Sequence, residues 1–181
     1  MKLKHSLIMS GLIATLGVTS AIAGERETKS YGAAAPSASD VQTFLFPEAE
    51  CESSKYQCLA VRPSQERSIG MDVRFQTGSS ELTPAAKAQL QGLGEALAAR
   101  NGKLKPGEIV IEGHADARGS AELNKRLSQE RAQAVVKHLV STHAIDGKTL
   151  KPVGVGSEHL KDSARPDSEV NRRVELVRSA I

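Results

Sequence analysis

The sequence predicts an α+β fold in which helices pack on one face of a mixed four-stranded sheet. Apolar residues alternate with polar ones, or run together, in short segments at 71–76, 108–114, 149–156 and 174–177, which is typical of β-strands. Between the first three segments, apolar residues recur every three or four positions at 83–101 and 120–143, as on one face of a helix. The resulting order, β-α-β-α-β-β, indicates a two-layer α/β sandwich.

The first predicted strand and helix carry clear local signals. Met71, Val73 and Phe75 share one side of the 71–76 segment, as in a half-buried strand. Thr83 before Pro84 provides an N-cap and a proline at the first helical position. Gly92 and Gly94 weaken this helix but allow close packing on the sheet.

The remaining elements follow in the same way. The 108–114 strand is apolar enough to be central, and the 120–143 helix has an apolar stripe about one face wide. Pro152 cannot donate a backbone hydrogen bond, so the 149–156 strand should lie at an edge or contain a bulge. The 174–177 strand completes the sheet.

Residues 1–23 have the pattern of a secretory signal peptide. Lys2 and Lys4 form a basic start, residues 6–23 carry no charge, and Ala21-Ile22-Ala23 offers small residues for cleavage. An uncleaved membrane anchor is the alternative, because about 18 apolar residues can just span a bilayer. Gly24, rather than a cysteine, follows the cleavage point, so no lipid anchor is expected. Cleavage would lower the formal charge from +3 to +1, too little to indicate a strongly acidic partner.

Residues 24–70 differ from the rest in composition. We expect residues 24–42 to be a flexible tether, residues 43–69 to be a disulfide-containing segment, and residues 70–181 to be the folded domain. In an exported chain, Cys51 and Cys58 are expected to form a disulfide, and their spacing is not that of a redox site. The aromatic stretch 44–46 could contact a partner or cover the domain's own apolar face. Residues 24–70 are too few for eight membrane strands, so no transmembrane barrel is expected.

Composition and motifs exclude several function classes. Aromatic residues make up 3% of the chain and tryptophan is absent, which argues against a base-stacking surface for nucleic acid. The sequence lacks the common nucleophile, zinc-protease and phosphate-loop motifs, so neither catalysis nor a cofactor is expected. His114 and Asp116 lack a third ligand at regular spacing, so no metal site is expected either.

One constellation can bind a small ion. Asp116 follows the central strand just before the 120–143 helix, and Asn124, Ser128 and Arg131 share one face of that helix. Arg131 can reach back toward Asp116, since helical side chains lean toward the N-terminus. A carboxylate and a guanidinium across a small gap would complement a zwitterion, although spacing alone favours a structural ion pair between the two.

Three sequence blocks resemble a known family. G-H-A-D-A-R-G at 113–119, N-K-R-L-S-Q-E-R-A at 124–132 and N-R-R-V-E at 171–175 are similar to the motifs of OmpA-like peptidoglycan-binding domains. The resemblance extends over about 70–178 and includes Phe75 and Gly154-Val155-Gly156. It implies the OmpA-like form of the predicted sandwich.

The resemblance also implies a function. Family members bind the diaminopimelate of peptidoglycan peptide stems without covalent chemistry. The resemblance therefore implies a periplasmic protein, peripheral to the outer membrane, that tethers or organises the envelope. An adaptor of a secretion or motility complex, with residues 24–70 contacting its partner, is the alternative. The motif aspartate falls on Asp116, for the ligand ammonium, and the motif arginine on Arg131, for the carboxylate. Other expected ligand-binding positions are Asn124, Leu127, Ala117 and Gly78, and the expected structural residues are Arg172, Arg173 and Phe75.

Overall fold

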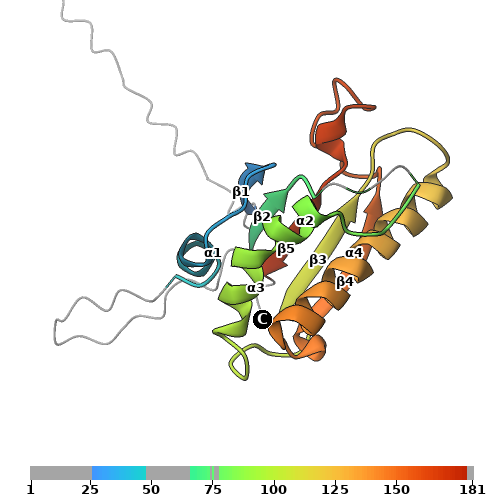
Figure 1. Ribbon diagram of the computed structural model, residues 1–181. Helices are drawn as coiled ribbons and strands as arrows, with labels where there is room; N and C mark the ends of the chain where they lie inside the picture. Colours follow the sequence, from blue (N-terminus) through green and yellow to red (C-terminus); the bar gives the residue numbers. More distant parts are fainter. Residues whose placement is uncertain (1–25, 48–65, 74, 76–77, 179–181) are drawn as a thin grey trace, which may run out of the picture.

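The sheet has five strands, one more than the sequence predicts. The computed structural model describes residues 26–47, 66–73, 75 and 78–178 (Figure 1). The strands are β1 (Glu27–Gly32), β2 (Arg67–Met71), β3 (Ile109–His114), β4 (Leu150–Gly156) and β5 (Val174–Arg178). The helices are α1 (Ala38–Leu45), α2 (Pro84–Gln89), α3 (Gln91–Ala98) and α4 (Ala121–His143), with short 3₁₀ turns η1 (Gly147–Thr149) and η2 (Glu169–Asn171).

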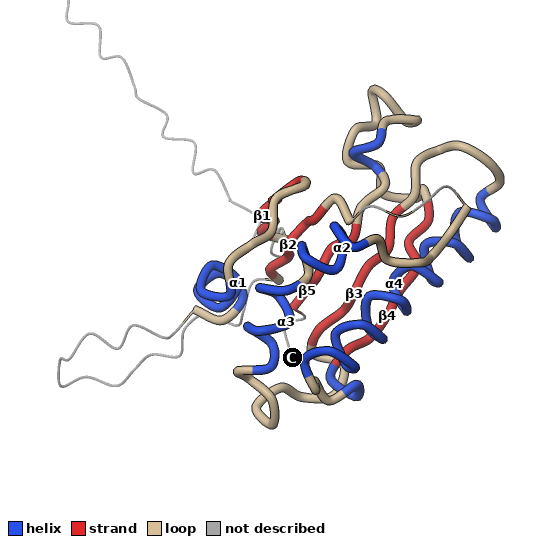
Figure 2. The backbone as a smooth tube through the Cα atoms, in the orientation of Figure 1, coloured by secondary structure: helices blue, strands red, loops and turns tan. Residues whose placement is uncertain are grey.

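The strand order is β1-β2-β5-β3-β4, and β5 is the strand that runs against its neighbours. Helices α2, α3 and α4 lie on one face of this sheet (Figures 1 and 2). The two-layer α+β architecture is therefore confirmed. The predicted edge position of the proline-containing strand is also confirmed, because β4 pairs with β3 alone and their register shifts near its end.

Residues 26–47 and 66–70 belong to the domain, so the expected tether and the boundary at residue 70 are wrong. Strand β1 adds to β2 in parallel, and helix α1 packs on α3 and β2. Val41 and Leu45 are fully buried in the core together with Ile69. A short polar strand such as β1 lacks the apolar alternation by which a strand is recognised in a sequence. Strand β1 forms because β2 offers a free edge for pairing.

Three arginines from other elements fix the end of α1. Arg67 Nη1 donates to the carbonyl of Phe44 at 2.7 Å, Arg178 Nη1 to that of Leu45 at 2.9 Å, and Arg100 Nη2 to that of Phe46 at 3.4 Å. These are carbonyls at the negative end of the helix dipole, where cations are favourable. Of the aromatic stretch 44–46, Leu45 and Phe46 are buried and Phe44 packs on the core, so the stretch covers the domain's own apolar face.

Two predicted elements are displaced or divided. The first strand ends at Met71 instead of running over 71–76, and Phe75 makes an isolated antiparallel bridge with Leu82. The 83–101 helix divides at Leu90 into α2 and α3. The close packing at Gly92 is against the backbone of Pro36, not against the sheet, because a Cβ at this position would collide with the Pro36 carbonyl.

Helix α4 sits unusually close to strands β3 and β4. A Cβ at Gly113 would collide with the carbonyl of Ser128, and one at Gly154 would collide with the backbone of Gln129. The Ser128 hydroxyl donates to the Lys125 carbonyl and accepts from the amide of Gly156, both at 2.9 Å. This close approach fixes the height of α4, and therefore the position of the residues on its inner face.

A partly buried ion pair joins the residue just before β1 to the centre of the sheet. Arg26 makes two contacts with the Glu112 carboxylate, at 2.8 and 3.3 Å. Burial would raise the pKa of Glu112, but His114 and Arg26 outweigh burial and lower this pKa from 4.5 to about 2. The carboxylate is thus ionised in the folded protein at a pH where it would be protonated in the unfolded chain.

This ion pair predicts a pH-dependent stability. A group with a lowered folded pKa contributes stability that is present above its unfolded pKa and is lost as the pH falls through the folded one. Relative to Glu112→Gln, the wild type should therefore be more stable at pH 7, by about 2 kcal/mol, and lose this advantage between about pH 4.5 and pH 2. Urea unfolding of both proteins across this range measures the difference. Glu81→Gln removes an exposed carboxylate and should change stability by less than about 0.5 kcal/mol at each pH; a pH-independent difference for Glu112→Gln would contradict the prediction.

Candidate functional site

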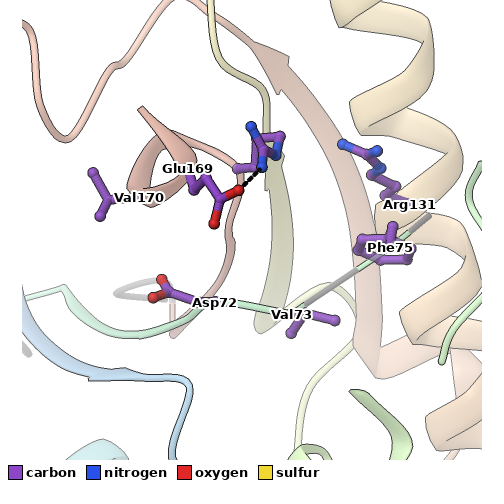
Figure 3. A pocket seen from close by; sticks show the side chains of 7 residues that line it. Asp72, Val73, Phe75, Arg131, Glu169 and Val170 are labelled. Carbon is purple, nitrogen blue, oxygen red and sulfur yellow. Dashed lines mark ion pairs between the residues drawn. The ribbon is translucent and has the colours of Figure 1, made fainter. Parts of the chain in front are cut away.

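A charged pocket of about 380 Å³ opens where the carboxyl end of β2 meets the start of β5 and the inner face of α4 (Figure 3). It is lined by Asp72, Val73, Phe75, Arg131, Glu169, Val170 and Arg172. Arg131 and Arg172 thus face the same small space as the carboxylates of Asp72 and Glu169, so the lining is charged but balanced in sign.

Arg131 is buried and lacks a counter-ion. Its side chain comes from α4 and lies with its guanidinium 5.0 Å from the centre of the Phe75 ring. Nε donates to the backbone carbonyl of Ser79 at 3.2 Å, and no carboxylate of the described residues lies within ion-pair distance. Burial lowers the pKa of Arg131 and so does Arg172, whereas Asp116 opposes this shift. A buried cation without a partner is costly, so the pocket favours an anion beside it.

Asp116 pairs with Arg172, not with Arg131. Its Oδ2 accepts from Arg172 Nη1 at 2.8 Å, and its Oδ1 accepts from the amide of Arg118 at 3.2 Å. Arg172 also contacts the exposed Glu169 at 3.0 Å, and the hydrogen bond to Asp116 is the main reason why the pKa of Arg172 is raised. The structural Asp116–Arg131 ion pair that the sequence left open is therefore absent from the described contacts.

The structure places Arg172 in the pocket itself, although the sequence assigns it a structural position. Arg173, in contrast, points to the other side of the chain, where its Nε donates to Glu175 at 2.6 Å and its guanidinium reaches the carbonyl of His159 at 3.4 Å. Adjacent residues alternate in direction at the start of a strand, so the two arginines cannot share one role. Phe75 lies under Arg131 at the pocket wall.

Of the expected ligand-binding residues, Arg131 alone is among those that line the pocket; Asp116 is not, and neither are the other four. Asn124 is buried and its amide donates to the carbonyls of Asp116 and Arg118 at 3.0 and 2.9 Å, so it holds the loop that carries Asp116. Leu127 is half-buried, and Ala117 is exposed and donates its amide to the Pro166 carbonyl. Gly78 is exposed, with a positive φ of 69°. Cys51 and Cys58 lie outside the described residues.

Asn171, the first residue of the 171–175 motif, is a positioning residue to which the sequence analysis assigned no role. It is fully buried, its amide donates to the carbonyls of Arg165 and Pro166 at 3.1 and 3.0 Å, and its Oδ1 accepts from the amide of Asp162 at 2.9 Å. The loop between β4 and β5 is thereby fixed above the pocket. Asp72 and Glu169 were also missed, since nothing in their local sequence marks them as neighbours of Arg131.

The described part of the chain contains one group of residues that could hold a metal ion: Glu112, His114 and Glu175. It lies apart from the pocket and does not include Asp116. Among the described helices, none is both long enough and apolar enough to cross a membrane.

The fold and the pocket together define a small α+β domain that presents an arginine-lined pocket at one end of its sheet. The profile of the OmpA family matches residues 74–173, which is more than half of the chain. The protein belongs to the OmpA family. The solved OmpA-like domain of FopA1 from Francisella tularensis shares the fold, with a TM-score of 0.52 and 18% identity over 61% of this chain and 70% of that one.

Two named relatives extend the comparison. The chain is 34% identical over 104 residues to the peptidoglycan-associated lipoprotein of Pseudomonas aeruginosa, which covers 56% of this chain and 58% of the relative. It is 42% identical over 106 residues to outer membrane protein A of Shimwellia blattae, which covers 59% of this chain and 42% of the relative. The chain therefore spans about half the length of these relatives.

Proposed function

We propose that this protein binds cell-wall peptidoglycan in the bacterial periplasm, without catalysing a reaction, by holding the free zwitterionic end of diaminopimelate in the peptide stem. The observation that carries the proposal is the buried guanidinium of Arg131, which faces the pocket and has no counter-ion among the described residues. The name of the relative from P. aeruginosa, a peptidoglycan-associated lipoprotein, supports the choice of ligand.

The ligand carboxylate would lie against Arg131. A planar guanidinium can bind both oxygens of a carboxylate, and this bond is strong where water is largely excluded. The Phe75 ring and the Ser79 carbonyl already fix the orientation of Arg131, so little side-chain entropy is lost on binding.

The ligand ammonium would take the place that Arg172 occupies at Asp116. The second partner of Arg172, Glu169, is 80% exposed in its side chain, and exposed ion pairs contribute little. Arg172 can therefore turn toward Glu169 and solvent when an ammonium reaches Asp116. Asn124 keeps the Asp116 loop in place during this exchange, because it binds two backbone carbonyls of that loop.

Competition between small amines tests this arrangement. The mature protein is sedimented with purified sacculi in the presence of free diaminopimelate or of Nα-acetyl-lysine amide. The lysine derivative keeps the terminal ammonium, but both of its α groups are blocked, so it lacks the carboxylate that Arg131 would bind. We expect diaminopimelate to release the protein at concentrations where the lysine derivative does not. Equal release by both would contradict the zwitterion model, since it would show that an ammonium alone is recognised.

A further inference from the structure

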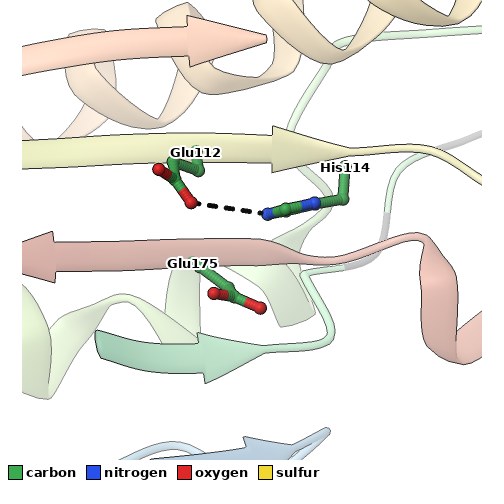
Figure 4. Close-up of side chains that lie close together, drawn as sticks. All are labelled: Glu112, His114 and Glu175. Atoms are coloured by element: carbon green, nitrogen blue, oxygen red, sulfur yellow. Dashed lines mark ion pairs between the residues drawn. The ribbon is translucent and has the colours of Figure 1, made fainter. Parts of the chain in front are cut away.

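The sheet face opposite helices α2, α3 and α4 carries a second polar cluster. Glu112 on β3 and Glu175 on β5 are direct cross-strand partners, and His114 lies two residues further along β3 on the same face (Figure 4). One ligand atom of each side chain lies within 4.8 Å of the others. This cluster is separate from the arginine-lined pocket, which opens toward α4.

The cluster needs a cation. Two carboxylates directly opposite each other on paired strands repel, and both are largely removed from water, with side-chain exposures of 15% and 9%. In the structure this cation is Arg26, with its Nη1 at 2.8 Å from Glu112 Oε2 and at 3.9 Å from Glu175 Oε2. Arg173 holds the other oxygen of Glu175 at 2.6 Å.

Arg26 is the most replaceable member of this cluster. It belongs to the chain just before the edge strand β1, its side chain is 34% exposed, and it already has an alternative partner in Glu66 at 3.4 Å. If Arg26 leaves Glu112, its own charge does not become both buried and unpaired. Its departure would free both the carboxylate and the space between Glu112 and Glu175.

His114 indicates what could enter that space. Its side chain is 2% exposed, yet neither ring nitrogen has a hydrogen-bond partner. Nε2 lies 3.8 Å from Glu112 Oε2, which is too far for a hydrogen bond and somewhat longer than the separation of about 3.4 Å between two ligands on one tetrahedral metal ion. Buried imidazoles are normally bonded through at least one nitrogen, so an unbonded one that faces two carboxylates has the character of a metal ligand.

We propose that Glu112, His114 and Glu175 form a binding site for a zinc ion, and that Arg26 competes with the metal for it. The donors would be Nε2 of His114 and one oxygen of each glutamate, a set that suits zinc better than the oxygen-preferring calcium or magnesium. At metal–ligand distances of about 2.1 Å, the donors must close by roughly 1 Å, which the departure of Arg26 permits. With zinc in place of Arg26, the charges of the metal ion, the two glutamates and Arg173 sum to about one positive charge.

Zinc binding to the full mature chain tests the proposal. Equilibrium dialysis against a chromogenic zinc chelator gives the affinity for wild type, Arg26→Ala, His114→Gln and Glu175→Gln. We expect wild type to bind one zinc ion in this site, Arg26→Ala to bind it about 10-fold more tightly, and the two ligand variants to bind it at least about 10-fold more weakly. Magnesium at the same concentration should not compete.

Matched controls separate this site from other donors. His138→Gln removes another histidine, from the α4 surface, and should leave the affinity unchanged. The double variant Cys51→Ser/Cys58→Ser should do the same. Thermal unfolding without zinc shows whether each variant is folded. Because there are two ligand variants, the test still works if one of them does not fold. Zinc binding that persists in both ligand variants, or that is absent from both wild type and Arg26→Ala, would overturn the proposal.

Discussion

Arg131→Ala should weaken binding to sacculi about 100-fold, whereas Arg126→Ala should leave it unchanged. The two arginines lie five residues apart on α4, but Arg131 is buried at the pocket and Arg126 is exposed, with only a 3.8 Å contact to Glu130. Two charge-assisted hydrogen bonds to a carboxylate contribute about 3 kcal/mol together, which corresponds to roughly two orders of magnitude in affinity. Co-sedimentation over a series of sacculus concentrations measures the loss.

The same substitution should not unfold the protein. Arg131 contributes a buried charge without a counter-ion, so its removal also removes a desolvation cost. Arg131→Lys keeps the charge but cannot bind both carboxylate oxygens, and it should be intermediate in affinity. If Arg131→Ala sediments with sacculi as well as Arg126→Ala does, the pocket is not where peptidoglycan binds.

Leu45→Ala should destabilise the whole domain by about 3 kcal/mol. Leu45 is fully buried between α1 and the rest of the core, and replacing such a leucine by alanine removes packing and leaves a cavity. Thr43→Ala, on the exposed side of the same helix, should change the stability by less than about 0.5 kcal/mol. Urea unfolding followed by circular dichroism measures both differences.

The outcome distinguishes two descriptions of the N-terminal segment. If residues 24–70 were an independent adaptor arm, Leu45→Ala would barely affect the unfolding of the domain. A single cooperative unfolding transition, with its midpoint lowered in Leu45→Ala, would show that α1 is part of the same folding unit. Deleting residues 24–60 to search for lost partners would then be uninformative, because the deletion would remove β1, α1 and part of the core.

The sequence was sufficient for the elements that carry a strong apolar period. The bounds of helix α4 and of the strand at 108–114 were predicted closely, since both have a regular apolar period. The first half of the α4 stripe was wrong: Leu123 is exposed, and the buried face there carries Asn124 and Ser128 instead. Strand β1 has no such period: most of its side chains are exposed, and it exists because β2 offers an unpaired edge. Such long-range pairing cannot be recognised within a window of a few residues.

For the site, too, local features could be predicted from the sequence and long-range contacts could not. The proximity of Arg131 and Asp116 followed from helix geometry and from the family motifs, and the buried face shared by Asn124, Ser128 and Arg131 is observed. The partner of Asp116 could not be predicted, because Arg172 is 56 residues away and reaches Asp116 only through the loop that Asn171 holds. Likewise, Glu175 becomes a neighbour of His114 only through strand pairing.

The direction of β1 determines how the protein would carry a mechanical load. Strand β1 begins beside Arg67, at the start of β2, whereas the pocket lies beyond the other end of β2, at Asp72 and Val73. A pull between a pocket-bound wall and the chain that precedes residue 26 would therefore act along the strands. The β1–β2 hydrogen bonds would be loaded together, in shear, rather than opened one by one like a zipper. A domain built in this way resists such a pull with its whole first strand pair at once.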